Sequence, residues 1–220
     1  ASKILFVSKY VASQFSFKKP TSITVYNALP ETFVEQTKAI NIENTSAPFT
    51  VLMLCSLKAY KGVYEYIKIA KALPKIKFLL VLNTTQTEVD KFKSEVSPSE
   101  NCILYSAQKD TIQFYKQAHL VMNLSRPDQW IETFGMTVLE AMYCGRPVIV
   151  PPVGGVVELV DDGVEGYRID SRNLDEVIRK IENITTNYAI YKRLSLAAYK
   201  KANSFSQAIF QQQLMKVFGS

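Results

Sequence analysis

The chain has 220 residues, of which 47% are hydrophobic and 21% charged, and its formal net charge is +6. These values are ordinary for a globular protein with one sizeable core, and they exclude a disordered or low-complexity chain. No apolar run reaches the roughly 18 residues that span a bilayer, so we expect a soluble, cytoplasmic chain. The lysines lack the interleaved aromatic residues of a nucleic-acid-binding surface, which disfavours a nucleic-acid partner.

Two short apolar segments come first in the chain. Residues 4–7 and 23–26 predict two strands, and the polar, proline-bounded stretch at 31–49 predicts a linker. The basic, amphipathic segment at 58–77 predicts a helix with a solvated lysine face. A peripheral contact of this segment with the inner face of a membrane is the alternative.

Branched apolar runs alternate with segments of helical period from residue 50 onwards. The expected strands lie at 50–55, 78–82, 102–105, 120–124 and 147–150. Helices are expected near 63–73, 89–92, 112–115 and 136–143, with a short one near 156–160. Strands that are apolar on both faces, with helices between them, predict a doubly wound α/β fold with a parallel, Rossmann-like sheet. Ligands of such folds bind at the carboxyl ends of the strands.

The end of the chain, from 174 to about 218, has only helical period. Its final helix is expected to begin at Ser204 or Ser206, because serine is a favoured cap residue. The three cysteines of the chain are widely spaced and predict reduced core residues, not a disulfide framework or a zinc site. The single histidine, His119, has no partner motif and is expected to be a packing residue.

The segment Phe134-Gly135-Met136 lies at the start of an expected helix. The first amides of a helix lack intrahelical partners and the positive end of the helix dipole lies there, so this turn predicts an anion site. Glycine allows a phosphate to approach the backbone closely.

Two glutamates flank this anion site. Glu140 lies in an otherwise apolar helical run, where a buried carboxylate needs hydrogen-bonding partners that ligand hydroxyls could provide. Glu132 precedes the helix by a few residues, so the two carboxylates can straddle the anion site. The alternatives are a solvent-facing helix residue for Glu140 and a charge that merely complements the helix dipole for Glu132.

Several motifs in this region closely resemble glycosyltransferase family 4, which has the GT-B fold. The resemblance rests on Glu132-x7-Glu140-Ala141-Met142, on Gly145-Arg146-Pro147-Val148-Ile149, on Gly154-Gly155-x-x-Glu158-Leu159-Val160 and on Lys61-Gly62 after the first strand of the core. It covers residues from about 23 to 218 and implies the C-terminal, donor-binding half of the fold. The reaction implied is transfer of a hexosyl group from a UDP- or GDP-sugar to an acceptor hydroxyl with retention, in envelope polysaccharide or glycolipid synthesis.

The resemblance also implies roles for individual residues. Lys61 and Glu132 are expected to act in catalysis, Lys61 by contacting the donor diphosphate and Glu132 by binding the hexose. The further expectations are Gly135, Met136 and Thr137 for the diphosphate, Phe134 for the sugar, Glu140 for the ribose, and Tyr105, Ser106 and Ala107 beside the base. No metal and no cofactor is implied.

One departure from the family pattern concerns the phosphate site. Many members have Gly-Arg-Leu before the lysine, where this chain has Cys55-Ser56-Leu57, so the expected arginine is missing. Arg126 and Lys58 are candidates to replace it. Trp130 is expected to anchor its loop by packing, and a wall of the sugar site is the alternative.

The domain organisation implied by the resemblance has four parts. Residues 1–30 are expected to be the remnant of an N-terminal acceptor-binding domain with a crossover, and 31–49 the linker. Residues 50–203 are expected to form the nucleotide-sugar-binding domain and 204–220 the C-terminal crossover helix, with exposed Phe210, Leu214 and Phe218. The acceptor, a carbohydrate or glycolipid, is expected to bind the missing N-terminal domain, so this chain by itself is expected to be inactive.

Three other functions are weighed against this one. A GT-B-like epimerase of UDP-sugars would need catalytic carboxylates and a histidine that are not evident. A non-catalytic nucleotide-sugar-binding module would keep the binding motifs without activity. A dinucleotide oxidoreductase is disfavoured, because no Gly-x-Gly-x-x-Gly follows the strand at 50–55.

Overall fold

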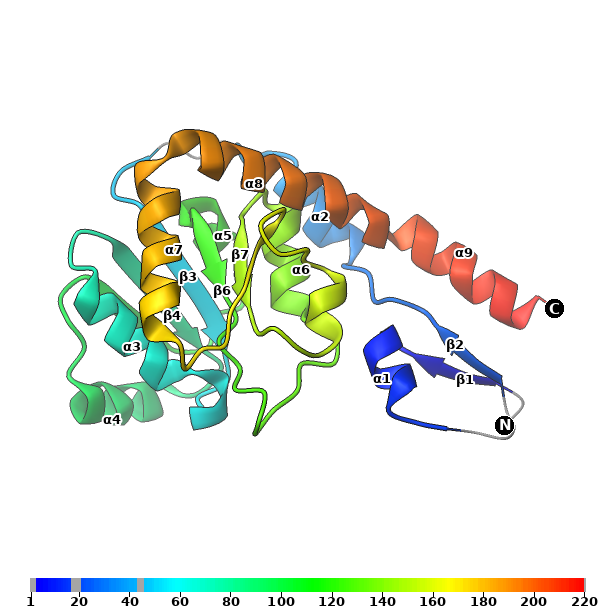
Figure 1. The fold of residues 1–220 in the computed structure, drawn as a ribbon, viewed down its shortest axis with the longest axis horizontal. Coiled ribbons are helices and arrows are strands. Elements are labelled where there is room, and N and C mark those ends of the chain that lie inside the picture. The colour runs from blue at the N-terminus through cyan, green and yellow to red at the C-terminus, as the bar shows by residue number, and fades with distance from the viewer. Residues whose placement is uncertain (1–2, 17–20, 43–45, 220) are drawn as a thin grey trace.

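The computed structural model describes residues 3–16, 21–42 and 46–219. Its main body is a six-stranded parallel sheet with the order β5-β4-β3-β6-β7-β8 (Figure 1). The strands are β3 (Thr50–Cys55), β4 (Lys77–Leu82), β5 (Cys102–Tyr105), β6 (Leu120–Met122), β7 (Val148–Val150) and β8 (Gly166–Arg168). The predicted doubly wound sheet is therefore confirmed, with strand order reversing between β3 and β6.

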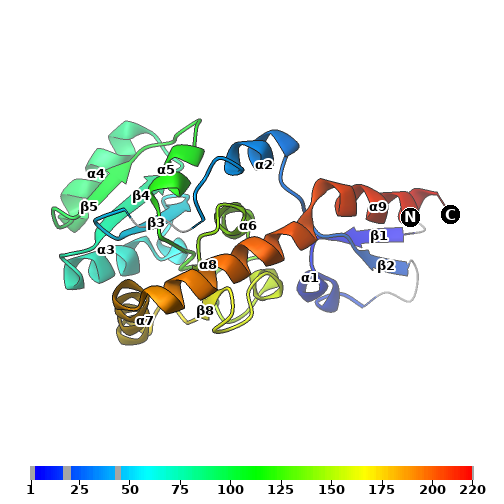
Figure 2. The same cartoon turned by 90° about the horizontal axis from the view of Figure 1, so that it is seen from above.

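Helices cover both faces of this sheet. Side chains that alternate along the strands, such as Val51 and Leu52, belong to two separate buried clusters. One face carries α3 (Val63–Ala72), α4 (Gln86–Val96) and α7 (Leu174–Thr186), and the other carries α5 (Ile112–Gln117) and α6 (Met136–Tyr143). Helix α8 (Tyr188–Ala202) runs across the domain and contributes residues to both clusters (Figure 2).

The sequence-based prediction missed three elements, strand β8 and two helices, at 31–37 and at 9–13. Strand β8 is only three residues long and contains a glycine and an arginine, so it carries no apolar run, and it forms by pairing with β7. The predicted linker at 31–49 contains helix α2 (Glu31–Thr37). This helix follows Pro30, which suits the start of a helix, and Phe33 and Val34 pack against the core beside α5.

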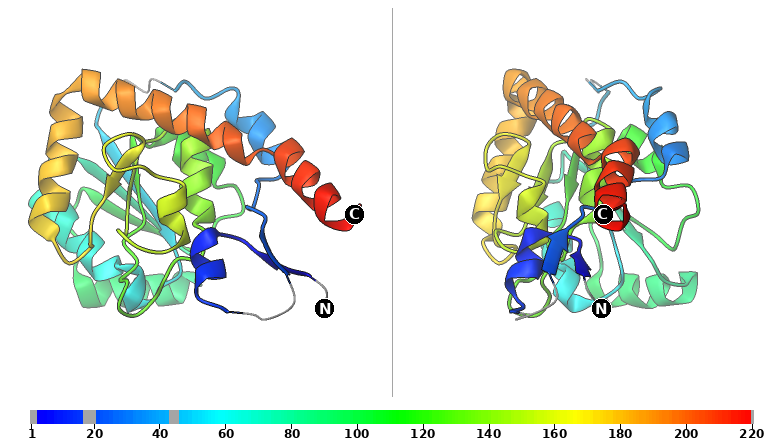
Figure 3. Two further views of the ribbon diagram at one scale, coloured as in Figure 1. Left: turned by 45° about the vertical axis from the view of Figure 1, so that its right-hand side comes forward. Right: turned by 90° about the vertical axis from the view of Figure 1, so that its right-hand side faces the viewer.

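The N-terminal segment forms a small unit beside the main sheet. Strands β1 (Lys3–Phe6) and β2 (Thr21–Thr24) pair in parallel, and helix α1 (Lys9–Ser13) lies between them in the chain. Both strands begin one or two residues before the predicted positions. Figures 2 and 3 show this unit at the same end of the molecule as helix α9 (Gln207–Phe218), and Lys3 Nζ donates to the carbonyl of Val217.

The C-terminal helix begins as predicted after Ser206, whose hydroxyl accepts from the amide of Ile209. The short turn η3 (Asn203–Phe205) precedes it. The predicted exposure of its apolar residues is confirmed for Phe218, which is 75% exposed, but it is wrong for Phe210 and Leu214, which are half-buried. Because α9 lies beside β1, the strand can cover one face of the helix. Only the residues on the opposite face of α9 then stay exposed.

The basic helix α3 buries its apolar residues in the core, where Tyr66, Ile67 and Ile69 are almost inaccessible. Its exposed residues are Lys68, Lys71 and Ala72, and Tyr64 is half-buried. Within the part of the chain that the structure describes, no helix is long and apolar enough to cross a bilayer.

A buried arginine joins three parts of the domain. Arg146 is 1% exposed, and its guanidinium donates to the carbonyls of Tyr115 at 3.0 Å and of Asn41 and Ile42 at 3.2 Å. It thereby fastens the segment before β3 to α5 and to the turn before β7. Gly145 permits this approach, because its φ is +67° and a Cβ there would meet Ile42 at 2.7 Å.

Replacing this arginine is expected to destabilise the domain. Arg146→Ala removes the donor to the buried carbonyl of Tyr115 and to the part-buried carbonyls of Asn41 and Ile42, and it opens a cavity, so the free energy of unfolding should fall by about 3 kcal/mol. Urea denaturation measures this loss. Arg179→Ala, which removes an exposed arginine of α7, is the control and should cost less than about 0.5 kcal/mol. Equal stability of the two variants would contradict the assigned role.

Candidate functional site

Two adjoining cavities lie at the carboxyl ends of the strands where the strand order reverses. The first has a volume of about 300 Å³ and the second of about 400 Å³. The first is lined by Asn27, Met53, Leu54, Cys55, Ser56, Lys61, Asn123, Leu124 and residues 132–137. The second is lined by Leu54, Cys55, Ser56, Val81, Asn83, Ala107, Gln108, Thr111, Thr137 and Glu140. Because Leu54, Cys55, Ser56 and Thr137 line both, the two cavities adjoin, and together we call them the switch-point groove.

The predicted catalytic pair, Lys61 and Glu132, meets in the first cavity. Lys61 ends the short turn η1 (Ala59–Lys61) after β3, and Glu132 lies in the loop after β6. The ammonium of Lys61 donates to Oε1 of Glu132, and the hydroxyl of Ser125 donates to the same oxygen at 2.7 Å. Both charged side chains are about 15% exposed, so water screens their attraction only weakly.

The surroundings of Glu132 keep it ionised. Burial raises the pKa of Glu132, but the hydrogen bond and charge of Lys61 lower it, as do hydrogen bonds from Ser125 and Asn123. The lowering effects outweigh burial, and the pKa lies below its ordinary value. The first cavity therefore contains a carboxylate and an ammonium that neutralise one another.

Gly62 brings Lys61 to the groove. Its φ is +77°, and a Cβ there would overlap both the carbonyl oxygen and the Cβ of Leu124 at the end of β6. No other residue fits so close to Leu124 with this backbone conformation. The close packing against Leu124 therefore explains why a glycine follows Lys61 in the sequence.

Two further glycines support the loop that carries Glu132. The amide of Gly155, at the start of the turn η2 (Gly155–Glu158), donates to the carbonyl of Glu132 at 2.7 Å. A Cβ on Gly155 would overlap the carbonyl of Thr133, and one on Gly154 would lie 2.6 Å from the carbonyl of Glu132. The Gly154-Gly155 motif therefore allows backbone to pack on backbone beneath the carboxylate.

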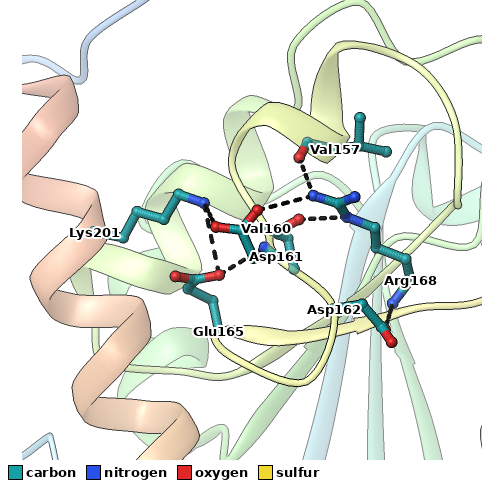
Figure 4. Close-up of polar contacts among 7 residues, drawn as sticks. All are labelled: Val157, Val160, Asp161, Asp162, Glu165, Arg168 and Lys201. Carbon is teal, nitrogen blue, oxygen red and sulfur yellow. Dashed lines mark hydrogen bonds and ion pairs between the residues drawn. The ribbon is translucent and has the colours of Figure 1, made fainter.

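The loop between β7 and β8, which contains η2, is held from two sides (Figure 4). Arg168 of β8 donates to the carbonyl of Val157 at 2.7 Å and to the carboxylate of Asp161 at 3.2 Å. Lys201 of α8 donates to Asp161 at 2.7 Å and lies 3.7 Å from the carboxylate of Glu165. These contacts tie the loop between β7 and β8 to the helix that crosses the domain.

Glu158, the glutamate of the same motif, holds the N-terminal segment against the groove. Its carboxylate accepts from the amides of Lys9 and Tyr10 at 3.1 and 2.8 Å and from the hydroxyl of Tyr26 at 2.7 Å. The residue after Tyr26 is Asn27, which lines the first cavity. The part of the chain before the linker thus contributes directly to the candidate site, which the sequence patterns do not indicate.

The start of helix α6 lies between the two carboxylates. Its N-cap, Gly135, has a φ of +101°, and no side chain of the described residues caps the helix. Gly135, Met136 and Thr137 all line the first cavity, and Thr137 lines the second as well. Uncapped first-turn amides at a cavity wall are suited to binding an anion. Phe134 also borders the cavity, and its buried ring contacts the rings of Tyr26 and Phe205.

Glu140 lies in the second cavity and differs electrostatically from Glu132. Its Oε2 accepts from the hydroxyl of Tyr115 at 2.6 Å. Burial raises the pKa of Glu140, and the hydrogen bond from Tyr115 lowers it only in part, so the pKa lies above its ordinary value. The carboxylate has no cationic partner among the described residues around it, which leaves it suited to accept hydrogen bonds from hydroxyl groups.

The far end of the second cavity is lined mostly by residues other than those expected beside the base. Of the three residues expected beside the base, only Ala107 lines the cavity. The ring of Tyr105 packs on Phe114 at 5.0 Å, and neither Tyr105 nor Ser106 is among the lining residues. The polar groups at this end are Asn83, Gln108 and Thr111, which follow strands β4 and β5 and belong to no motif in the sequence.

Neither candidate for the missing phosphate-binding arginine lines the groove. Arg126 turns away and pairs with the buried carboxylate of Glu65 on α3, and its amide donates to the carbonyl of Tyr60 at 2.8 Å. Lys58 is exposed at the start of η1, and its charge acts on Glu88. Ser56 lines both cavities instead. The lining residues therefore include one cation, Lys61.

Two other predictions concern side chains outside the groove. His119 is buried, accepts from the amide of Thr50 at 3.0 Å and stacks on Phe49, which confirms it as a packing residue. Burial lowers the pKa of His119 to about 4, with a further contribution from Arg146, so it is neutral at pH 7. All three cysteines are unpaired, and Cys102 and Cys144 are buried as expected, while Cys55 borders both cavities.

Substituting Gly62 is expected to disrupt the site and the fold together. Gly62→Ala combines a positive φ with overlap on Leu124, and the free energy of unfolding should fall by about 3 kcal/mol or more. Gly163→Ala is a matched control, because Gly163 has a φ of +76° with nothing within 4 Å of the added Cβ. It should cost only about 1 kcal/mol, from the backbone conformation alone. Equal losses in urea denaturation would show that the contact with Leu124 contributes nothing.

The raised pKa of Glu140 predicts a pH-dependent effect on stability. A glutamate whose pKa is higher in the folded than in the unfolded state destabilises the fold as pH rises through that interval. Glu140→Gln removes this charge and can still accept from Tyr115, so it should unfold at higher urea concentration than the wild type at pH 7. The difference should shrink as pH is lowered toward 4, where Glu140 becomes protonated. A difference that is independent of pH would contradict this, and Glu182→Gln on the exposed side of α7 is the control.

Comparison with known proteins gives consistent matches. A family model described as "Glycosyl transferases group 1" matches residues 35–201. A sucrose synthase of Melioribacter roseus is 35% identical over 91 residues, which are 39% of this chain and 12% of that protein. An uncharacterized glycosyltransferase of Haemophilus influenzae is 25% identical over 187 residues, which are 83% of this chain and 50% of that protein.

The fold has solved counterparts as well. The crystal structure of Anabaena Alr3699/HepE in complex with UDP and glucose superposes with a TM-score of 0.80 at 21% identity, over 100% of this chain and 63% of that one. The chain spans half or less of the length of the curated relatives named above. Because the family model covers most of the chain and the structural neighbours have the GT-B fold, this chain belongs to the glycosyl transferases group 1 family.

Proposed function

We propose that the switch-point groove binds the nucleoside diphosphate sugar from which the whole protein transfers a hexosyl group to an acceptor hydroxyl. The observation that carries this proposal is the arrangement along the groove. Lys61 and the uncapped start of α6 lie between two carboxylates that have opposite pKa shifts. A diphosphate needs cations and amides, while a sugar and a ribose on either side of it need hydrogen-bond acceptors.

Each part of the donor has a matching part of the groove. The diphosphate would accept from Lys61 and from the amides of Met136 and Thr137, which stabilise the charge that develops on the departing nucleotide. Glu132 would accept from hexose hydroxyls in the first cavity, and Glu140 from the ribose hydroxyls in the second. We propose that transfer retains the configuration of the sugar, as the resemblance to family 4 implies.

Uridine is the proposed nucleoside. The Anabaena protein is described with UDP, and the second cavity ends in the neutral polar side chains of Asn83, Gln108 and Thr111. Amide and hydroxyl groups can satisfy both the carbonyl oxygens and the N–H group of uracil. Guanosine and adenosine diphosphates are the competing ligands that a binding experiment must include.

The wider setting is proposed on less direct support. The acceptor is proposed to be a carbohydrate or a glycolipid in envelope polysaccharide or glycolipid synthesis. The net charge of +6 would favour a cytoplasmic protein that contacts the anionic inner face of a membrane peripherally. Donor binding is proposed for this chain and transfer for the protein as a whole, with no metal or cofactor.

One observation favours a second candidate, a non-catalytic nucleotide-sugar-binding module. Ser56 stands where many relatives have a phosphate-binding arginine, and Arg126 is engaged by Glu65. The described lining residues thus include two carboxylates and one ammonium. A donor that binds but never releases free UDP in the presence of acceptors would support this candidate over the enzyme.

Calorimetric titration with UDP, GDP and ADP tests the donor site. We expect selective binding of UDP and a loss of roughly 10- to 100-fold in affinity for Glu140→Ala and for Lys61→Ala, because each removes charge-assisted hydrogen bonds. Glu182→Ala and Lys68→Ala change the same charges on exposed surfaces of α7 and α3 and should bind as the wild type does. Equal affinity of all five proteins for UDP would refute the assignment.

A further inference from the structure

The only tryptophan of the chain, Trp130, lies directly behind Lys61. The ammonium of Lys61 is 4.8 Å from the centre of the indole ring, while it also pairs with Glu132. Trp130 itself is absent from the lining of both cavities, so it contacts the groove through Lys61. Its position therefore suggests an effect on the lysine and not on a ligand.

The indole is fixed in place although it is 43% exposed. The ring of Tyr60 stacks on it with centroids 5.2 Å apart and an interplanar angle of 15°. The amide of Trp130 donates to the carbonyl of Arg126 at 2.8 Å, and the amide of Arg126 donates to the carbonyl of Tyr60 at 2.8 Å. The pair between Arg126 and Glu65 adds a further tie to α3. The loop after β6 is thus joined to η1 and α3 around this one aromatic stack.

An aromatic contact and a carboxylate hold an ammonium in different ways. The carboxylate neutralises its charge, whereas the face of an indole attracts the cation and leaves its net charge available. A lysine side chain is long and flexible, and holding it in one rotamer reduces the entropy that ligand binding must remove. When a diphosphate approaches, Lys61 can exchange Glu132 for a phosphate oxygen while the indole keeps the ammonium in place.

We propose that Trp130 is a positioning residue of the diphosphate subsite, which holds Lys61 so that a diphosphate replaces Glu132 as its counter-ion. The exchange would also free Glu132 to accept from sugar hydroxyls. This inference rests on the proposed donor site. It assigns Trp130 an electrostatic task beyond the packing of its loop.

The test separates the phosphate contribution from the nucleoside contribution to binding. Titrations of UDP, uridine and inorganic pyrophosphate are compared for the wild type, Trp130→Leu, Trp130→Phe and Lys61→Met. We expect Trp130→Leu to weaken UDP and pyrophosphate binding by about tenfold, the size of a partly desolvated cation–π contact, with uridine unchanged. Trp130→Phe retains an aromatic face and should recover most of the loss. A residue that merely packs its loop would weaken all three ligands or none.

A double-mutant cycle shows whether Trp130 acts through Lys61. In the Lys61→Met background, Trp130→Leu should have no further effect on UDP affinity. The same loss in both backgrounds would overturn the inference, as would wild-type affinity of Trp130→Leu for UDP. Phe218→Leu removes an exposed aromatic ring of α9 and serves as the control. Unchanged urea denaturation of each variant shows that the fold is retained.

Fluorescence of the single tryptophan gives a readout that needs no ligand. Lys61→Met should change the emission of Trp130, whereas Lys68→Met should not, and UDP should alter the emission of the wild type but not of Lys61→Met. If the wild type bound neither UDP nor uridine, the proposed donor site would be wrong. Pyrophosphate titration of the same proteins would then decide the role of Trp130 separately, and an absence of pyrophosphate binding would overturn that role too.

Discussion

After the neighbouring parallel strands β3 and β6, the chain continues on opposite faces of the sheet. The groove lies where these two segments diverge. Lys61 follows β3 at the start of α3, while Glu132 and the first amides of α6 follow β6. The reversal of strand order therefore brings together groups that are about seventy residues apart in the chain, as the contact between Lys61 and Glu132 shows. The glycines at 62, 154 and 155 make this approach sterically possible.

In the groove, the negative charge of Glu132 is neutralised by the neighbouring Lys61, and the described lining residues contain no excess of cations. Glu132 and Glu140 lie eight positions apart, yet the pKa of the first is lowered by Lys61 and that of the second is raised by burial. A ligand that brings negative charge to Lys61 and hydroxyl groups to both carboxylates would satisfy all three side chains. Without a ligand, Lys61 is paired with Glu132 while it lies over Trp130, and the proposed exchange of counter-ion depends on both contacts.

Much of this arrangement could be predicted from the sequence, because it depends on local signals. Branched apolar runs identified five strands of the main sheet, residue type and position marked the two glutamates, and the resemblance to family 4 marked the Lys61-Gly62 pair. Strand β8 and helix α2 were missed, since each forms through tertiary contacts that a short polar segment does not reveal. The polar end of the second cavity was missed for a similar reason, because Asn83 and Thr111 belong to separate loops that only the sheet brings together.

The pairing of Arg126 with Glu65 shows a different limit. An arginine in a loop beside the site is an obvious candidate for a phosphate, but its orientation depends on a buried carboxylate sixty-one positions away. No periodicity connects the two residues, so only the fold shows that the arginine braces the loop. Trp130 is a related case, since packing was the correct expectation for its ring and its contact with Lys61 emerges only in three dimensions.

A crystal structure of this chain with UDP would test the groove most directly. The proposed donor site predicts the ribose at Glu140, uracil beside Asn83 and Gln108, and phosphates on Lys61 and the amides of Met136 and Thr137. It also predicts that the ammonium of Lys61, still over Trp130, pairs with a phosphate oxygen in place of Glu132. Nucleotide bound elsewhere on the domain, or bound in the groove with its phosphates away from Lys61 and α6, would contradict the proposed site.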